Sequence, residues 1–373
     1  MHVEQLVFDA GSWRHRNSAT VKSPQLVLAF LSPGMDDAAA AFEKLRGQFS
    51  RAHVVGCTTG GEILDDEVFD NAGVALAVEF EGATISVANI AHSQYPNSFE
   101  AGIALGEKLA SDNLRGVFVL SDGVLVNGTQ LVRGLRERFG DQVSITGGLA
   151  GDRADFRETL VGADDRLQPD RVAAIGFYGS LQIQHGSNGG WDAFGPQRWI
   201  TKSAGNVLYE LDGNPALDLY KRYLGDEAKQ LPGSALLYPL KVYKAGQENN
   251  YLVRTIISID ESAKSMTFAG EMPQGSMAQL MVGHFDRLIN GAGNAVKAIA
   301  ANRENSFAIL VSCIGRKLLL GQRAFEEAQE VHERLGKMPQ IGFYSYGEIS
   351  PHSLSGLCEL HNQTMTVSVF TEH

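Results

Sequence analysis

Short, continuous apolar runs alternate along this chain with segments in which apolar residues recur at helical spacing. The first such unit, Gln25 to Ile63, opens with the run QLVLAFLSPG, which Pro-Gly stops. Asp36 or Asp37 then stands where a carboxylate caps a helix by accepting free backbone N–H groups. The unit closes with AHVVGCTTGGEI, a strand that leads into a glycine-rich turn. A stripe at three- and four-residue spacing predicts the helix between the two strands: Ala38, Phe42, Leu45 and Phe49.

The same pattern returns twice further along the chain. Arg115 to Asp152 opens with RGVFVLSDG and closes with VSITGGLAGD, and Ser306 to Ile349 opens with SFAILVSCIG and closes with IGFYSYGEI. Gly336 is placed to end the helix of the last unit, because glycine adopts the conformation that follows a helix C-terminus. Self-similarity of this kind predicts one strand–helix–strand unit used three times. The helix stripes are Leu131, Leu135 and Phe139 in the second unit, and Phe325, Ala328, Val331 and Leu335 in the third.

Each unit closes on an acidic, glycine-rich turn. The first and third share the pattern G-x4-G-E-I, with Glu62 and Glu348 as their acids, and the second has Asp152 in the analogous place. Three converging carboxylates would suit a metal ion or a ligand amine. We favour the alternative, in which each carboxylate accepts N–H groups of its own turn, because duplication copies a structural solution. The turn glycines are expected to adopt positive φ.

Strand patterns fill much of the remaining sequence. Ala72 to Asn89 and Arg171 to Asn188 each place an aromatic residue and a glycine between two alternating stretches, which predicts two β-hairpins. TMTVSVF predicts one terminal strand, and YLVRTIISID with SMTFAGEM predicts a further hairpin. Ala278 to Arg303 predicts a long helix. We place a domain boundary near Asn214-Pro215, after the turn at Asp212-Gly213.

The predicted fold class is therefore α/β (mixed α+β). It has two domains, residues 24–214 and 215–373, with mixed β-sheets flanked by helices and built from repeated β-α-β-ββ units. A length of 373 residues agrees with two domains, and 44% hydrophobic residues are enough for substantial cores.

Charge and cysteine content exclude several classes of protein. The formal net charge of −11, without a basic cluster, argues against nucleic-acid binding. The three cysteines fit neither a C-x-x-C motif nor a disulfide framework. No run approaches 18 apolar residues and the start, MHVEQLVFDAGSW, does not resemble a signal peptide. We therefore expect a cytoplasmic protein that does not contact a membrane.

Several motifs, in order along the chain, resemble the bacterial FIST proteins, which have an N-terminal and a C-terminal FIST domain. The motifs are GCTTGGEI, ITGGLAGD, GGWDAFGP, GNVLYELDG, NNYLVR, GFYSYGEISP and ELHNQTMT. The resemblance implies a sensory role in signal transduction, with a small ligand and no enzymatic activity. The chain resembles in particular the stand-alone FIST proteins, which bind haem b, sense nitric oxide and act on a histidine kinase or a cyclic-di-GMP enzyme. A homo-oligomer is also compatible with this family resemblance.

Haem requires an axial ligand, most often histidine, and an apolar pocket. His185 is the first candidate, because it ends a predicted strand before a glycine-rich loop, where Trp191, Phe194 and Trp199 are available as pocket walls. His361 and His352 are the next candidates. Each also has a structural interpretation, as a hydrogen-bonding residue at a strand end. No metal other than haem iron is expected.

Two alternatives stay open from the sequence. One is a haem-free receptor for an amino acid or another small metabolite. The other is an enzyme in which Cys57, at a strand end before a glycine-rich loop, acts as a nucleophile. The enzyme alternative lacks an evident base, because His53 lies four residues earlier on the same predicted strand.

Overall fold

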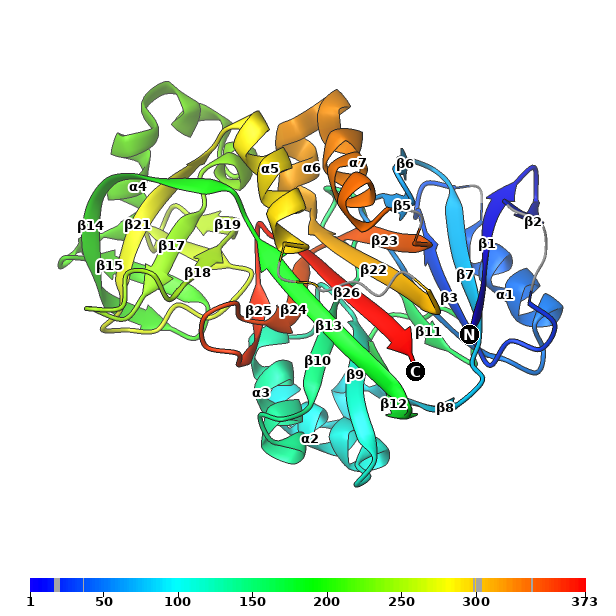
Figure 1. Ribbon diagram of the computed structural model, residues 1–373. Coiled ribbons are helices and arrows are strands. Elements are labelled where there is room, and N and C mark those ends of the chain that lie inside the picture. The colour runs from blue at the N-terminus through cyan, green and yellow to red at the C-terminus, as the bar shows by residue number, and fades with distance from the viewer. Residues whose placement is uncertain (17–20, 36, 298, 300–303, 337) are drawn as a thin grey trace.

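The computed structural model describes residues 1–373 except 17–20, 36, 298, 300–303 and 337 (Figure 1). It has a mixed α/β fold in which helices flank mixed sheets, and this confirms the predicted fold class. Three six-stranded sheets contain the repeated unit, and a further sheet is formed by residues 191–283, which we call the inserted region. In Figure 1 the inserted region lies to the left of the three repeats.

Repeat 1 forms a sheet with the strand order β11-β4-β3-β7-β1-β2. β3 and β4 are parallel and α1 connects them, so the unit predicted from Gln25 to Ile63 is confirmed. Asp37 caps α1 by accepting a hydrogen bond from Ala40 N at 2.7 Å, whereas Asp36 lies outside the described residues. The elements are β1 (His2–Asp9), β2 (Ser12–His15), β3 (Leu26–Leu31), α1 (Ala38–Gln48), β4 (His53–Thr58), β5 (Glu62–Leu64), β6 (Glu67–Phe69) and β7 (Gly73–Glu79).

Repeat 2 forms the sheet β25-β24-β10-β9-β12-β8, in which β9 and β10 are the parallel pair connected by α3. α2 and α3 pack against each other and cover the outer face of this sheet (Figure 1). The elements are β8 (Ala83–Ala91), α2 (Ser98–Leu109), β9 (Leu114–Ser121), α3 (Gly128–Phe139), β10 (Ser144–Leu149), β11 (Val161–Ala163) and β12 (Arg171–Gly179).

Repeat 3 forms the sheet β13-β26-β22-β23-β5-β6, with β22 and β23 parallel. The helix of this repeat ends at Gly336 as predicted, since Gly336 has φ 70° and its N–H bonds to His332 O. The elements are β13 (Leu181–Asn188), α5 (Phe285–Ala295), β22 (Ser306–Cys313), α6 (Ile314–Leu320), α7 (Ala324–Leu335), β23 (Gln340–Ser345), β24 (Gly347–Pro351), β25 (Cys358–His361) and β26 (Met365–Glu372).

The three repeats exchange strands in a ring. After its second parallel strand each repeat extends an arm that pairs with the corresponding strand of another repeat. The arm β5 of repeat 1 pairs with β23 of repeat 3, β24 of repeat 3 pairs with β10 of repeat 2, and β11 of repeat 2 pairs with β4 of repeat 1. Each of these pairings is antiparallel, so the same connection occurs three times and closes on itself.

Backbone hydrogen bonds also connect the three repeats in a closed ring, at the point where their three turns meet. Gly60 N donates to Tyr344 O at 2.7 Å. Tyr346 N donates to Leu149 O at 3.2 Å, and Gly151 N donates to Thr58 O at 3.0 Å. A core of apolar side chains from all three sheets lies between them, and it includes Phe30, Phe118, Phe177, Phe343 and Phe370.

The strand exchange explains why the prediction of two hairpins after the first two units was wrong. β7 pairs with β1 and β3 in repeat 1, whereas β8 pairs with β12 in repeat 2. β12 and β13 likewise belong to different sheets. The short connections therefore carry the chain from one repeat to the next. The two chain ends also meet, because the Met1 ammonium lies 3.1 Å from Glu372 Oε2 (Figure 1).

The inserted region leaves repeat 3 after β13 and returns before α5. The predicted hairpin is present as β19 with β20, and Asp212-Gly213 forms the expected turn, with φ of 51° and 73°. The prediction of one long helix from Ala278 was wrong in its first part, because residues 277–283 form a strand. The elements are β14 (Trp191–Ala204), β15 (Val207–Leu211), β16 (Asn214–Pro215), α4 (Ala216–Leu224), β17 (Leu240–Tyr243), β18 (Tyr251–Arg254), β19 (Ile256–Asp260), β20 (Ser265–Phe268) and β21 (Met277–Gly283).

Candidate functional site

Two of the predicted histidines lie face to face in a cavity between repeat 3 and the inserted region. The rings of His352 and His361 are stacked, with centroids 5.8 Å apart and planes at 11°. The cavity has a volume of about 100 Å³. Repeat 3 contributes the loop after β13 and the segments on either side of β25, and β18 contributes the opposite wall. The lining residues are Ser187, Asn188, Gly189, Trp191, Asn249, Tyr251, Val253, His352, Ser353, His361 and Thr364.

His352 is held by hydrogen bonds at both ring nitrogens. Its Nδ1 accepts from Leu354 N at 3.3 Å, so its Nε2 carries the proton and donates to Tyr251 O at 3.1 Å. The second bond joins the β24–β25 connection to β18 of the inserted region. His352 thus has a hydrogen-bond partner at each ring nitrogen.

His361 keeps one nitrogen available. Its Nε2 lies 3.0 Å from Ser350 O, so this nitrogen carries the proton and Nδ1 holds a lone pair. Burial lowers the pKa of His361 to about 3; the hydrogen bond to the Ser350 carbonyl opposes this shift, and the nearby His352 and Arg254 add to it. The side chain is thus neutral at physiological pH. His361 Nδ1 is a hydrogen-bond acceptor in a cavity whose lining has no charged side chain.

Trp191 is the one predicted wall residue that lies at this cavity. It is buried, and its Nε1 donates to Gln363 O at 2.8 Å, which fixes the indole against the β25–β26 turn. Phe194 and Trp199 follow on β14 but are 52% and 47% exposed, and neither lines the cavity. The structure thus separates the three aromatic residues that the sequence groups together.

His185 lies on β13 near the cavity without lining it. Alternation along the strand puts Ile183, His185 and Ser187 on one face, and Ser187 is a wall of the cavity. His185 Nδ1 is buried without a partner among the described residues, and burial lowers the pKa of this histidine. The structure therefore brings His352, His361 and Trp191 together and places His185 one strand step, about 6.6 Å, away from Ser187.

Apart from Trp191, the sequence did not single out the residues that the inserted region supplies. Asn249 and Tyr251 belong to the motif NNYLVR, which contributed to the family resemblance, but nothing in the sequence connected them with His361. They reach the cavity because β18 lies against β25, where Arg254 Nη1 donates to Leu360 O at 3.0 Å.

A porphyrin does not fit this cavity. Pockets that bind drug-sized ligands have volumes of about 300–1000 Å³, well above the 100 Å³ found between His352 and His361. One of the two histidines, moreover, already has a partner at both nitrogens. Within the part of the chain that the structure describes, no group of three or more His, Cys, Asp or Glu side chains is placed to hold a metal ion.

The acidic turns have a structural role. Glu62 Oε1 accepts from Thr59 Oγ1 at 2.5 Å, and Glu348 Oε1 accepts from Ser345 Oγ at 2.7 Å. Asp152 accepts from the backbone of its own loop, from Phe156 N at 2.8 Å and Arg157 N at 2.8 Å. Only Asp152 accepts backbone N–H groups of its own loop, as we expected of all three acids. Glu62 and Glu348 accept from hydroxyls of their own turns, and Glu348 Oε2 also accepts from Thr364 N at 3.1 Å.

Asp152 is not the counterpart of the two glutamates, and this corrects the sequence comparison. On the arms, Glu62 stands opposite Phe343 and Glu348 opposite Gly148. The arm residue in the same register of repeat 2 is Val161, opposite Cys57. Repeat 2 therefore lacks a carboxylate at this position of its arm, and the three acids do not form a symmetric triad.

The Cys57 thiol lacks the features of a nucleophile. It is fully buried on β4, and burial, followed by the nearby Glu62 carboxylate, raises its pKa well above the usual value. His53 is engaged elsewhere, with its Nδ1 2.6 Å from Asp164 Oδ2. The enzyme alternative has no support from this geometry.

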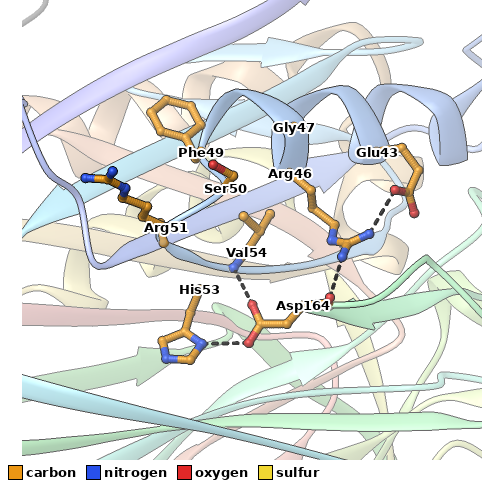
Figure 2. Close-up of a pocket in the computed structure, with 10 residues that line it drawn as sticks. Glu43, Arg46, Gly47, Phe49, Ser50, Arg51, His53, Val54 and Asp164 are labelled. Carbon is orange, nitrogen blue, oxygen red and sulfur yellow. Dashed lines mark hydrogen bonds and ion pairs between the residues drawn. The ribbon is translucent and has the colours of Figure 1, made fainter.

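Figure 2 shows a wider surface depression of about 540 Å³ beside His53, at the amino end of β4. Its charged groups bind one another: Arg46 donates to Glu43 Oε2 at 2.8 Å and to Asp164 O at 2.6 Å. Arg51 points away from Asp164 in this view. Ligands of α/β sheets bind at the carboxyl ends of parallel strands, so this depression at the opposite end is not the preferred site.

Comparisons with known proteins identify the family of this chain. Residues 25–214 match the FIST N domain and residues 216–351 match the FIST C domain. The chain is 22% identical to an uncharacterized protein of Methanocaldococcus jannaschii, over 89% of this chain and 70% of that protein. It is 24% identical to uncharacterized proteins of Mycobacterium bovis and Mycobacterium tuberculosis, over 46% of this chain and 46% of each of theirs.

Among the described residues, none of the helices combines the length and apolarity needed to cross a membrane. The chain belongs to the FIST family, whose domains are associated with the sensing of small ligands in signal transduction.

Proposed function

We propose that this protein is a receptor for a compact, uncharged polar metabolite that binds in the cavity between His352 and His361. The observation that carries the proposal is the lone pair of His361 Nδ1 in a buried, charge-free cavity. A ligand O–H or N–H group would donate to this nitrogen, and the faces of Trp191 and Tyr251 would cover its apolar part. The small volume selects against larger molecules.

The position of the cavity supports a signalling role. Its walls come from repeat 3 on one side and from β18 of the inserted region on the other. A ligand that contacts both sides stabilises one relative arrangement of the two parts, and it shifts the equilibrium by its difference in affinity for the alternatives. The partner that reads this change is, on the family resemblance, a histidine kinase or a cyclic-di-GMP enzyme acting in the cytoplasm.

Haem-based sensing of nitric oxide is the second candidate function, and it is carried by the family resemblance together with His361 Nδ1 as the available nitrogen. It requires the inserted region to move away from repeat 3, because the cavity is too small for a porphyrin as it stands. The two candidates predict different results in one experiment.

The experiment uses the whole chain and two variants, His361→Ala and His53→Ala. The second variant is a matched control, since His53 lies outside the cavity and is paired with Asp164. Small uncharged polar metabolites are screened by the rise that each causes in the melting temperature. We expect at least one to stabilise the wild type and the control but not His361→Ala, because ligand binding stabilises the folded state by mass action.

Haem is then added to the same three proteins and the visible spectrum is recorded. A Soret band that responds to nitric oxide and disappears in His361→Ala would show that the ligand is haem and not a metabolite. A metabolite that stabilises all three proteins equally would show that the binding site does not include His361.

A further inference from the structure

A second and larger cavity lies where repeat 2 meets the inserted region. Its volume is about 430 Å³, within the range of about 300–1000 Å³ that is usual for small-molecule sites. It opens at the carboxyl ends of the parallel strands β9 and β10, which is where α/β sheets bind ligands. The lining residues are Gly123, Val124, Leu125, Val126, Asn127, Leu149, Phe156, Asn206, Ile257, Ser258, Phe268, Ala269 and Tyr346.

A fixed pair of aromatic rings forms one wall of this cavity. Phe156 and Tyr346 are stacked, with centroids 4.3 Å apart and planes at 17°. The Tyr346 hydroxyl donates to Asp152, and Asp152 Oδ1 accepts from Phe156 N at 2.8 Å, so one carboxylate positions both rings. Phe156 has φ 52°, a conformation that bulky residues rarely adopt. The surroundings hold the ring in place against this cost.

The rim of the cavity is apolar and exposed. Nine large hydrophobic side chains are exposed among the described residues, and three of them surround this one cavity. They are Val124, Leu125 and Ile257, with exposed fractions of 41%, 54% and 39%. No charged side chain lines the cavity, although 20% of the chain is charged. A concave, uncharged, apolar surface of this kind marks a ligand site.

Two asparagines each keep one side-chain group without a hydrogen-bond partner among the described residues. Asn127 Oδ1 caps α3 by accepting from Gln130 N at 3.1 Å, which leaves its Nδ2 as a donor. Asn206 Nδ2 donates to Phe268 O at 2.8 Å, which leaves its Oδ1 as an acceptor. This pair complements the edge of a ring that carries both a ring-nitrogen acceptor and an N–H donor.

We propose that this cavity binds a planar, uncharged heteroaromatic molecule that stacks on the aromatic wall of Phe156 and hydrogen-bonds to Asn127 and Asn206. The site is distinct from the His361 cavity, since no residue is shared between the two linings. The two ligands belong to different chemical classes, one compact and polar and the other flat and aromatic. Both sites have one wall from the inserted region, which faces repeat 3 at the first site and repeat 2 at the second.

The test uses adenine and indole as probes and saturation-transfer NMR as the readout. Leu125→Asp and Ile257→Asp place a carboxylate on two sides of the rim, and both positions are exposed enough for the fold to tolerate the change. Leu318→Asp, at a residue that is 42% exposed on α6, is the matched control. Circular dichroism verifies that each variant is folded.

We expect the wild type to bind at least one probe at millimolar concentration, with affinity at least about tenfold weaker in both rim variants. Leu318→Asp and His361→Ala are expected to bind the probes as the wild type does. The result therefore does not depend on whether the His361 cavity binds a ligand. The proposal is overturned if neither probe receives saturation from the wild type. It is also overturned if the rim variants bind as strongly as the control.

Discussion

Glu62 and Glu348 are buried carboxyl groups that share one arrangement in two repeats. Each accepts a hydrogen bond from a hydroxyl three residues earlier, Thr59 or Ser345. Burial raises the pKa of both glutamates to about 8, and this outweighs the hydrogen bonds that lower it.

Glu62→Gln is therefore expected to change the pH dependence of stability. Between pH 4.5 and about 8 the folded state retains a proton that the unfolded state has lost, so raising the pH lowers the free energy of unfolding. The amide of Gln removes this titration, and the pH slope becomes shallower than in the wild type by up to about 1.4 kcal/mol per pH unit. Urea unfolding of both proteins at several pH values measures the difference. Parallel pH profiles would contradict the assignment.

At the scale of single elements, the three parallel strand pairs use glycine for the same reason. Gly56, Gly147 and Gly342 each face the neighbouring parallel strand so closely that a Cβ would overlap a backbone carbonyl. The sequence led us to expect positive φ at all the turn glycines, but among these three only Gly147 has it. Close approach of two backbones, rather than left-handed conformation, excludes a side chain at the other two.

Gly342→Ala is expected to lower the free energy of unfolding by more than about 2 kcal/mol, because the obstructing atom is backbone and cannot move away. Gly47→Ala is the matched control. Gly47 lies in α1 with nothing within 4 Å of the added Cβ, and alanine there is expected to raise stability by about 0.5–1 kcal/mol. Equal effects of the two changes in denaturant unfolding would show that the strands tolerate the methyl group.

Elements that depend on nearby residues could be predicted from the sequence, and elements that depend on distant partners could not. The units around α1, α3 and α7 were predicted because each helix buries apolar residues of its stripe, as Leu131 and Leu135 do, although Phe325 of α7 is 47% exposed. The hairpins were predicted wrongly because β7 finds its partners in β1 and β3 and not in the strand that follows it. The strand at residues 277–283 was missed because Met281 stands at helical spacing from Phe285 and Leu288 of α5.

Some residues of the candidate site could likewise be predicted from the sequence and others could not. His352, His361 and Trp191 were found because strand ends and glycine-rich loops are visible in the sequence. Tyr251 was missed because it is contributed by β18, about a hundred residues earlier than the histidines in the chain, and no local pattern indicates that contact. Haem binding and the division of the chain at residue 214 stay predictions.

At the scale of the whole molecule, stability depends on the closed ring of exchanged strands. Residues 1–214 contain repeats 1 and 2, but their strand β5 pairs with β23 and their strand β10 pairs with β24. β13 likewise pairs with β26. A chain cut after residue 214 would leave these edges unpaired and would expose the core that Phe343 and Phe370 complete.

The fragment 1–214 is therefore expected to be unfolded or aggregated on its own. Co-expression with the fragment 215–373 is expected to restore a folded complex, because the second fragment supplies β22 to β26. Circular dichroism and gel filtration compare the single fragment with the pair. A cooperative, monomeric fragment 1–214 would show that the ring is not needed for folding.

The ring of arms has a further consequence for the origin of this chain. One repeat taken alone has a sheet with an open edge beside its second parallel strand and an arm that fits the same edge of an identical neighbour. Three separate copies of such a polypeptide would close into a homotrimer with head-to-tail contacts. Joining the three copies in one gene would give the connectivity seen here. The inserted region then interrupts only the third copy, so the binding sites along it have no equivalents in the other two copies.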